Sequence, residues 1–136
     1  MFWDKKIETL KTDELQSLQL KRLKKTISQA QKVGFYKKRL SDAGVTTSSI
    51  KKLDDIQKIP FTKKQDLRDG YPFGLFAVPL KEIVRIHTTS GTTGKPTVVG
   101  YTKKDLDVWA DLIARNMTMV GVGKEDIFQN MVNYGM

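Results

Sequence analysis

The sequence contains no cysteine and only one histidine, His87, among its 136 residues. Without cysteine neither a disulfide framework nor a thiolate metal site can form, and a single histidine excludes a site built from several imidazoles. Long apolar runs are also missing, so the sequence predicts neither a membrane span nor a signal peptide. We therefore expect no metal site in this chain, no membrane partner and, by default, a cytoplasmic location.

Acidic residues are scarce relative to basic ones, with 15 Asp and Glu against 24 Lys and Arg, and the formal net charge is +9. Such an excess can indicate a nucleic-acid partner. However, the basic residues are spread over several predicted elements, and no zinc-finger, helix-turn-helix or RNA-binding signature accompanies them. We interpret them as solvated helix faces and expect no nucleic-acid partner. The 39% hydrophobic and 29% charged residues are typical of a globular domain.

The first half of the chain follows helical spacing. Leu15, Leu18, Leu23 and Ile27 recur at intervals that place them on one helix face, with Lys and Arg between them. Glycines and Pro60 then divide the following residues into shorter helices. The sequence predicts an N-terminal helical subregion over residues 1–70.

From residue 71 the pattern changes. The stretch 71–79 is punctuated by proline, glycine and aromatics, which predicts an ordered loop over apolar surface. Alternating β-branched residues predict strands over 82–87 and 97–101. Thr102 and Asp105 then form a capping box for a long amphipathic helix. An apolar run over 127–132 predicts a strand of the buried parallel kind, and strand, helix and strand in this order predict a βαβ crossover.

Between the first two predicted strands lies a loop over residues 88–97, with the sequence Thr-Thr-Ser-Gly-Thr-Thr-Gly-Lys-Pro-Thr. Hydroxyls donate hydrogen bonds, glycines let backbone N–H groups approach a ligand closely, and a lysine adds positive charge. These are the components of a phosphate-binding loop. A Walker A loop is excluded because Pro96, rather than Ser or Thr, follows Lys95. From spacing alone, a polar hairpin turn without a ligand remains an equal alternative.

The segment Ser90–Pro96 resembles the phosphate loop of the adenylate-forming enzymes, which include acyl-CoA synthetases. The flanking sequence is similar to the phenylacetate–CoA ligase family from about Leu15 to the last residue. The matching segments, in order, are 18–23, 35–36, 59–64, 66–68, 71–79 and 100–102.

The resemblance implies an α/β fold, in which an N-terminal helical layer is followed by the first β-hairpin and βαβ part of the large domain. Residues 71–136 would begin the AMP-binding domain, and its core would be incomplete because one crossover and a hairpin do not make a closed α/β core. We therefore expect the N-terminal part of a larger enzyme, with the remainder absent. The exposed strand edge also offers a route to a homodimer by strand exchange between two chains.

The resemblance further implies ATP-dependent activation of an aryl acid as an acyl-adenylate, followed by thioester formation with coenzyme A. The ATP phosphates would be held by Thr89, Ser90, Gly91, Thr92, Thr93, Gly94 and Lys95. The catalytic lysine and the ligand of Mg²⁺ would lie beyond Met136, so the chain contributes no catalytic residue and is expected to be inactive alone.

Three points stay open at the level of sequence. Tyr134 and Gly135 match the aryl-pocket motif of the family, but Val132 and Asn133 depart from it, so a ligase for another acid is an alternative. His87 either contacts substrate or phosphate or is a structural histidine. A non-catalytic basic binding or assembly module, whose loop is an accidental anion site, is the alternative outside enzymes.

Overall fold

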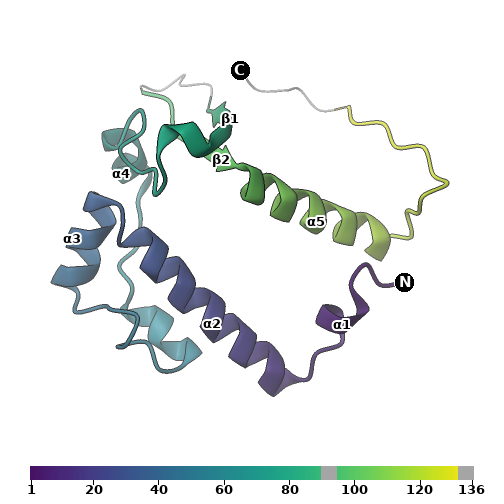
Figure 1. The fold of residues 1–136 in the computed structure, drawn as a ribbon, viewed down its shortest axis with the longest axis horizontal. Helices are drawn as coiled ribbons and strands as arrows, with labels where there is room; N and C mark the ends of the chain where they lie inside the picture. Colours follow the sequence, from purple (N-terminus) through teal and green to yellow (C-terminus); the bar gives the residue numbers. More distant parts are fainter. Residues whose placement is uncertain (90–94, 132–136) are drawn as a thin grey trace.

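The computed structural model describes residues 1–89 and 95–131. In these two ranges the chain forms α1 (Lys5–Glu8), α2 (Thr12–Ala30), α3 (Gly34–Asp42), the 3-10 helix η1 (Leu53–Lys58), α4 (Lys64–Asp69), the 3-10 helix η2 (Leu80–Glu82), β1 (Ile83–Thr88), β2 (Val98–Thr102) and α5 (Lys103–Met119). Figure 1 shows a ring with α2 and α5 as its two long sides. No helix within the described ranges has the length and apolar character needed to cross a membrane. The predicted mixed fold of helices and a small sheet is confirmed.

The buried core lies in the helical subregion. Ile27 of α2 and Leu40 of α3 form one cluster with Val45 and Ile50, and each of the four is at most 4% exposed. Among the described residues, the buried hydrophobic side chains all fall between residues 27 and 50. The hairpin and α5 therefore contribute no fully buried hydrophobic side chain, and the core belongs to the predicted helical layer. The division of the chain at residue 70 stays a prediction.

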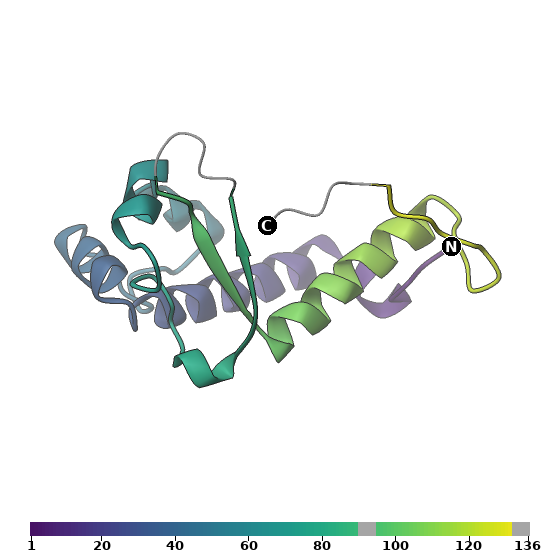
Figure 2. The same cartoon turned by 90° about the horizontal axis from the view of Figure 1, so that it is seen from above.

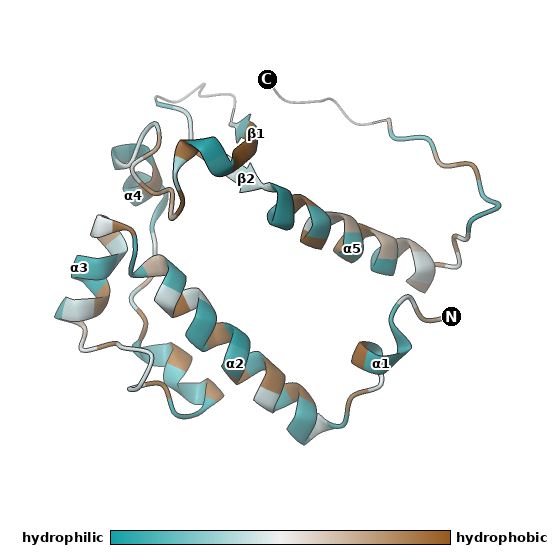
Figure 3. Ribbon diagram, in the orientation of Figure 1, coloured by the Kyte–Doolittle hydropathy of each residue, from teal (hydrophilic) through white to brown (hydrophobic). Residues whose placement is uncertain are grey.

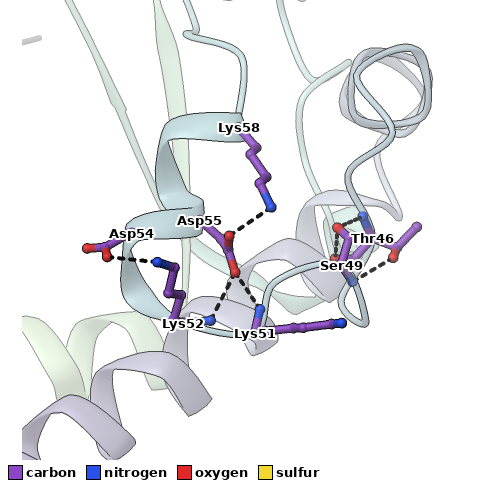
Figure 4. A network of polar contacts seen from close by, with 7 residues as sticks. All are labelled: Thr46, Ser49, Lys51, Lys52, Asp54, Asp55 and Lys58. Atoms are coloured by element: carbon purple, nitrogen blue, oxygen red, sulfur yellow. Dashed lines mark hydrogen bonds and ion pairs between the residues drawn. The ribbon is translucent and has the colours of Figure 1, made fainter.

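Asp55 fixes the segment that follows the core residue Ile50 (Figure 4). One carboxylate oxygen accepts hydrogen bonds from the backbone N–H groups of Lys51 and Lys52, at 2.7 and 3.0 Å, and the other pairs with Lys58 Nζ at 2.8 Å. The contact with Lys58 contributes most, and together with the two backbone hydrogen bonds it holds the pKa of the Asp55 carboxyl well below its usual range. The carboxylate is nearly buried, at 6% exposure, so this network orders the start of η1 against the core.

The two strands form an antiparallel hairpin, seen side by side in Figure 2. Arg85 pairs with Tyr101, His87 with Val99 and Thr88 with Val98, and the register is irregular between Ile83 and Arg85. The predicted strands over 82–87 and 97–101 are confirmed to within one residue. The loop that joins them therefore connects two strands and does not open a helix.

The sequence predicts an ordered loop over apolar surface for residues 71–79, and in the structure this loop packs against the hairpin. The rings of Phe73 and Phe76 lie 5.3 Å apart, and the Phe76 ring sits directly against the backbone of Gly100 in β2. A Cβ atom at position 100 would lie 2.6 Å from two carbons of that ring and 3.1 Å from the Ile83 side chain. Glycine at this position lets the aromatic loop approach the sheet closely.

The helix α5 starts at the predicted capping box. The Thr102 hydroxyl accepts from the Asp105 N–H at 3.2 Å, and the Asp105 carboxylate accepts from the Thr102 N–H at 2.8 Å. In the middle of α5, Asp111 accepts a hydrogen bond from Trp3 Nε1 at 2.6 Å. This contact brings the N-terminal segment to α5 and closes the ring seen in Figure 1.

The predicted strand over 127–132 is wrong for the part that the structure describes. Residues 127–131 have no regular secondary structure, and Ile127 and Phe128 are 100% and 62% exposed. A strand needs a neighbour to satisfy its backbone N–H and C=O groups, and within the described ranges the sheet contains only β1 and β2. Within the described residues the βαβ crossover is therefore not formed, although its first strand, β2, and its helix, α5, are present.

We predict that Asp55→Asn lowers the free energy of unfolding at neutral pH. A carboxyl whose pKa is depressed by folding stabilises the protein above its unfolded pKa, near 4, and this contribution is lost as the pH falls through the folded value. The difference between the variant and the parent should thus shrink steadily below about pH 4. Urea denaturation at several pH values measures it. Asp54→Asn, at a carboxylate with 76% side-chain exposure, is the matched control. A difference independent of pH would contradict the role of the carboxylate.

We also predict that Gly100→Ala destabilises the chain by about 1–3 kcal/mol, because the added methyl group must displace the Phe76 ring. Denaturant unfolding followed by circular dichroism gives the change. Gly34→Ala, where an added Cβ meets nothing within 4 Å, should be neutral or slightly stabilising. Equal stability of the two variants would show that the Phe76 contact does not hold the hairpin.

Candidate functional site

The structure describes the two ends of the predicted phosphate loop. Thr88, Thr89 and the segment 95–97 are described, whereas the predicted ligand residues Ser90, Gly91, Thr92, Thr93 and Gly94 lie outside the described residues. Tyr134 and Gly135 of the predicted aryl pocket lie outside them as well. The roles assigned to all of these residues stay predictions.

Two hydrogen bonds between Thr89 and Thr97 close the base of the loop. The Thr89 N–H donates to the Thr97 carbonyl at 3.1 Å, and the Thr97 N–H donates to Thr89 Oγ1 at 3.0 Å. They continue the β1–β2 ladder by one residue beyond the Thr88–Val98 pair. Because the Thr89 hydroxyl acts as an acceptor in this bond, its own hydrogen can still be donated to a ligand.

Lys95 is solvent-exposed and lies in a bend immediately before Pro96. No ion pair between described residues involves it, the acidic partners in such pairs being Glu8, Asp42, Asp54, Asp55, Asp66 and Asp107. The structure thus places Thr89 and Lys95 at the same end of the hairpin, on the two arms of the loop, where an anion would meet a hydroxyl and an ammonium group.

Below the loop, three aromatic rings join one face of the hairpin to α5. The His87 ring lies 5.2 Å from that of Tyr101 and 5.6 Å from that of Trp109, and the Tyr101 and Trp109 rings stack at 5.3 Å. The sequence analysis did not predict this cluster. In the hairpin His87 lies opposite Val99, and Tyr101, two residues after Val99, is on the same face of the sheet. The pairing of the two strands therefore brings His87 and Tyr101 to one face.

An open cleft of about 1110 Å³ lies between α2, the 71–79 loop, the hairpin and the start of α5. Its lining includes Ala30, Val33, Phe76, Val98 and Val108. No sequence pattern predicts this cleft, because its walls come from segments far apart in the chain.

Lys25 of α2 and Lys104 of α5 both line this cleft. The neighbouring ammonium of Lys104 lowers the pKa of Lys25. This cationic pair was also missed by the sequence analysis, since only the folded chain brings the two helices together. Among residues 1–89 and 95–131, no group of three or more His, Cys, Asp or Glu side chains could hold a metal ion.

Comparison with known proteins identifies relatives of this chain. No protein-family model matches it. The phenylacetate–coenzyme A ligase of Thermus thermophilus is 47% identical over 137 residues, which cover 100% of this chain and 31% of that protein. The phenylacetate–coenzyme A ligases of Escherichia coli K12 and Aromatoleum evansii are 49% and 48% identical over 131 residues, 96% of this chain and 30% of each protein.

Among solved structures, 2-hydroxyisobutyryl-CoA ligase is similar with a TM-score of 0.77 and 35% identity, over 85% of this chain and 26% of that one. That structure is a complex with 2-HIB-AMP and CoA in the thioesterification state. The observed fold is thus that of a part of an adenylate-forming CoA ligase. The chain is thus similar to one part of these phenylacetate–coenzyme A ligases, which it matches along 96–100% of its own length and about 30% of theirs.

Proposed function

We propose that this chain is the N-terminal part of an ATP-dependent phenylacetate–CoA ligase and supplies the loop that holds the ATP phosphates. The observation that supports it most is the closed base of the hairpin, where Thr89 and Thr97 exchange two hydrogen bonds and Lys95 is exposed beside them. The identity of 44–49% to four phenylacetate–coenzyme A ligases supports the assignment of the reaction. Such an enzyme would act in the cytoplasm.

In the proposed reaction a carboxylate attacks the α-phosphate of ATP, giving an acyl-adenylate and pyrophosphate, and the thiol of CoA then displaces AMP. As pyrophosphate leaves, negative charge develops on its oxygens. Preorganised hydroxyl and N–H donors with one ammonium group stabilise such charge. Thr89, Ser90, Thr92 and Thr93 would donate from hydroxyls, and Lys95 would supply the positive charge. Gly91 and Gly94 would admit backbone N–H groups.

Mg²⁺ would accompany ATP, with its protein ligand and the catalytic lysine in the part of the relatives that this chain does not match. Tyr134 and Gly135 would belong to the aryl pocket. The identity of the acid as phenylacetate rests on the similarity to phenylacetate–coenzyme A ligases. A ligase for another acid is the second candidate, because the similar solved structure is of a 2-hydroxyisobutyryl-CoA ligase at 35% identity.

Titration calorimetry of the 136-residue chain with ATP and with pyrophosphate tests the loop. We expect binding of both, and Lys95→Ala should weaken it about tenfold through the loss of a charge-assisted contact. Gly91→Val should abolish it by blocking the approach of the backbone. Lys51→Ala, at an exposed lysine outside the loop, is the control and should bind as the parent does. If neither Lys95→Ala nor Gly91→Val changes the binding, a basic module with an accidental anion site is the better account.

We further predict that the purified chain alone forms no acyl-CoA from phenylacetate, ATP, Mg²⁺ and CoA. Binding phosphate without groups that act on the transition state does not accelerate the reaction. Chromatography of the products after a long incubation measures it, with the full-length Thermus thermophilus relative as the positive control. Sustained formation of phenylacetyl-CoA would refute the assignment of the catalytic groups to the unmatched part.

A further inference from the structure

The face of the hairpin that carries the aromatic cluster also carries the base of the candidate phosphate loop. Side chains two residues apart in a strand lie on the same face of a sheet, so His87 shares a face with Thr89. Their partners across the hairpin, Val99 and Thr97, lie on that face as well. His87 thus stands between the rings of the cluster and the threonine pair that closes the loop.

The closure of the loop depends on how Thr89 is held. One of the two hydrogen bonds joins backbone groups, from the Thr89 N–H to the Thr97 carbonyl at 3.1 Å. In the other, the Thr97 N–H donates to the hydroxyl oxygen of the Thr89 side chain at 3.0 Å. This second bond requires a particular rotamer of Thr89 as well as the extended backbone. A rotation at the end of β1 would misalign it, and a hydrogen bond weakens steeply with misalignment.

Ring contacts fix the end of β1 against α5. A hairpin of two strands is marginally stable by itself, and within the described ranges the buried hydrophobic side chains lie between residues 27 and 50, outside the hairpin. Figure 3 shows hydrophilic residues interspersed with apolar ones along α5. The hairpin and α5 therefore meet through individual contacts. The His87 ring lies 5.2 Å from that of Tyr101 and 5.6 Å from that of Trp109, both within the range of favourable aromatic pairs.

Trp109 gives the cluster an anchor outside the two strands. It lies near the start of α5, and its ring stacks on that of Tyr101 at 5.3 Å. The same end of α5 is held by the capping box of Thr102 and Asp105. The Trp109 ring therefore has a fixed position relative to β2, and the contact with His87 passes this constraint on to β1.

We infer that His87 is a positioning residue for the candidate phosphate loop. By packing on Tyr101 and Trp109, its ring holds Thr89 in the conformation that accepts from the Thr97 N–H and leaves the Thr89 hydroxyl hydrogen for a phosphate oxygen. The inference rests on the proposed function for the ligand, whereas the positioning is a property of the free chain. Because the ring of His87 makes the contacts, another aromatic ring should serve in its place.

Amide hydrogen exchange measured by ¹H–¹⁵N NMR tests the positioning without a ligand. In the parent the amides of Thr89 and Thr97 should exchange slowly, because both are hydrogen-bonded. His87→Val keeps a side chain suited to a strand but removes the ring, and it should speed the exchange of both amides about tenfold. Trp109→Leu, which removes the anchor on α5, should do the same. His87→Phe should exchange as the parent does.

A merely structural role of His87 would act on the whole chain. Exchange of the Ile27 amide in the helical core reports such global opening, and it should be unchanged in all three variants. Phe35→Leu is the matched control, because it removes one ring of the edge-to-face pair with Tyr36 in the helical subregion. It should leave the exchange of the two loop amides as in the parent. Circular dichroism verifies that each variant keeps its helices. If His87→Val does not, Trp109→Leu, which alters neither strand, decides the question.

Titration with pyrophosphate measures the consequence for binding. His87→Val and Trp109→Leu should weaken the binding about tenfold, and His87→Phe should bind as the parent does. Parent-like exchange or affinity in the first two variants would overturn the inference. Equal acceleration of exchange in His87→Phe and His87→Val would overturn it as well. A parent that binds no pyrophosphate would refute the phosphate loop instead, and the exchange rates would still decide the role of His87.

Discussion

The pairing of β1 with β2, closed by the two hydrogen bonds between Thr89 and Thr97, is the constraint on which the candidate site depends. It brings Thr89 and Lys95 to one end of the hairpin. At the other end it delivers Thr102 in the geometry that caps α5. Without this pairing, residues 88–97 would be a polar segment of many conformations, and holding a phosphate would cost the entropy of ordering them.

Two different contacts hold the hairpin in place. On one face the Phe76 ring fills the space above Gly100, and on the other Tyr101 and Trp109 surround His87. The histidine is therefore positioned by rings from β2 and α5. The His87 side chain nevertheless remains exposed to solvent.

The sequence was informative wherever the structure depends on neighbouring residues. The hairpin could be predicted from alternation and from the glycine-rich loop, and the start of α5 from Thr102 and Asp105, because strands, turns and caps have local signals. The strand predicted over 127–132 is wrong for residues 127–131, since an apolar run forms a strand only where a neighbouring strand is present to pair with it. The Lys25–Lys104 pair depends on a tertiary contact and had no local signal, and the same is true of the contact of Trp109 with His87 and Tyr101.

The buried core and the candidate site lie in different parts of the chain. Its buried hydrophobic side chains lie between residues 27 and 50, while the hairpin and α5 carry the candidate site and an apolar face open to solvent. The candidate site and the cleft are separate, because the loop is at the tip of the hairpin and the cleft is beside its strands.

Amide chemical shifts in ¹H–¹⁵N NMR spectra during addition of pyrophosphate test the central claim most directly. The account predicts saturable shifts that are largest for the amides of residues 89–95 and small for the helical core. Unchanged loop amides, or shifts confined to the basic helix surfaces, would contradict it.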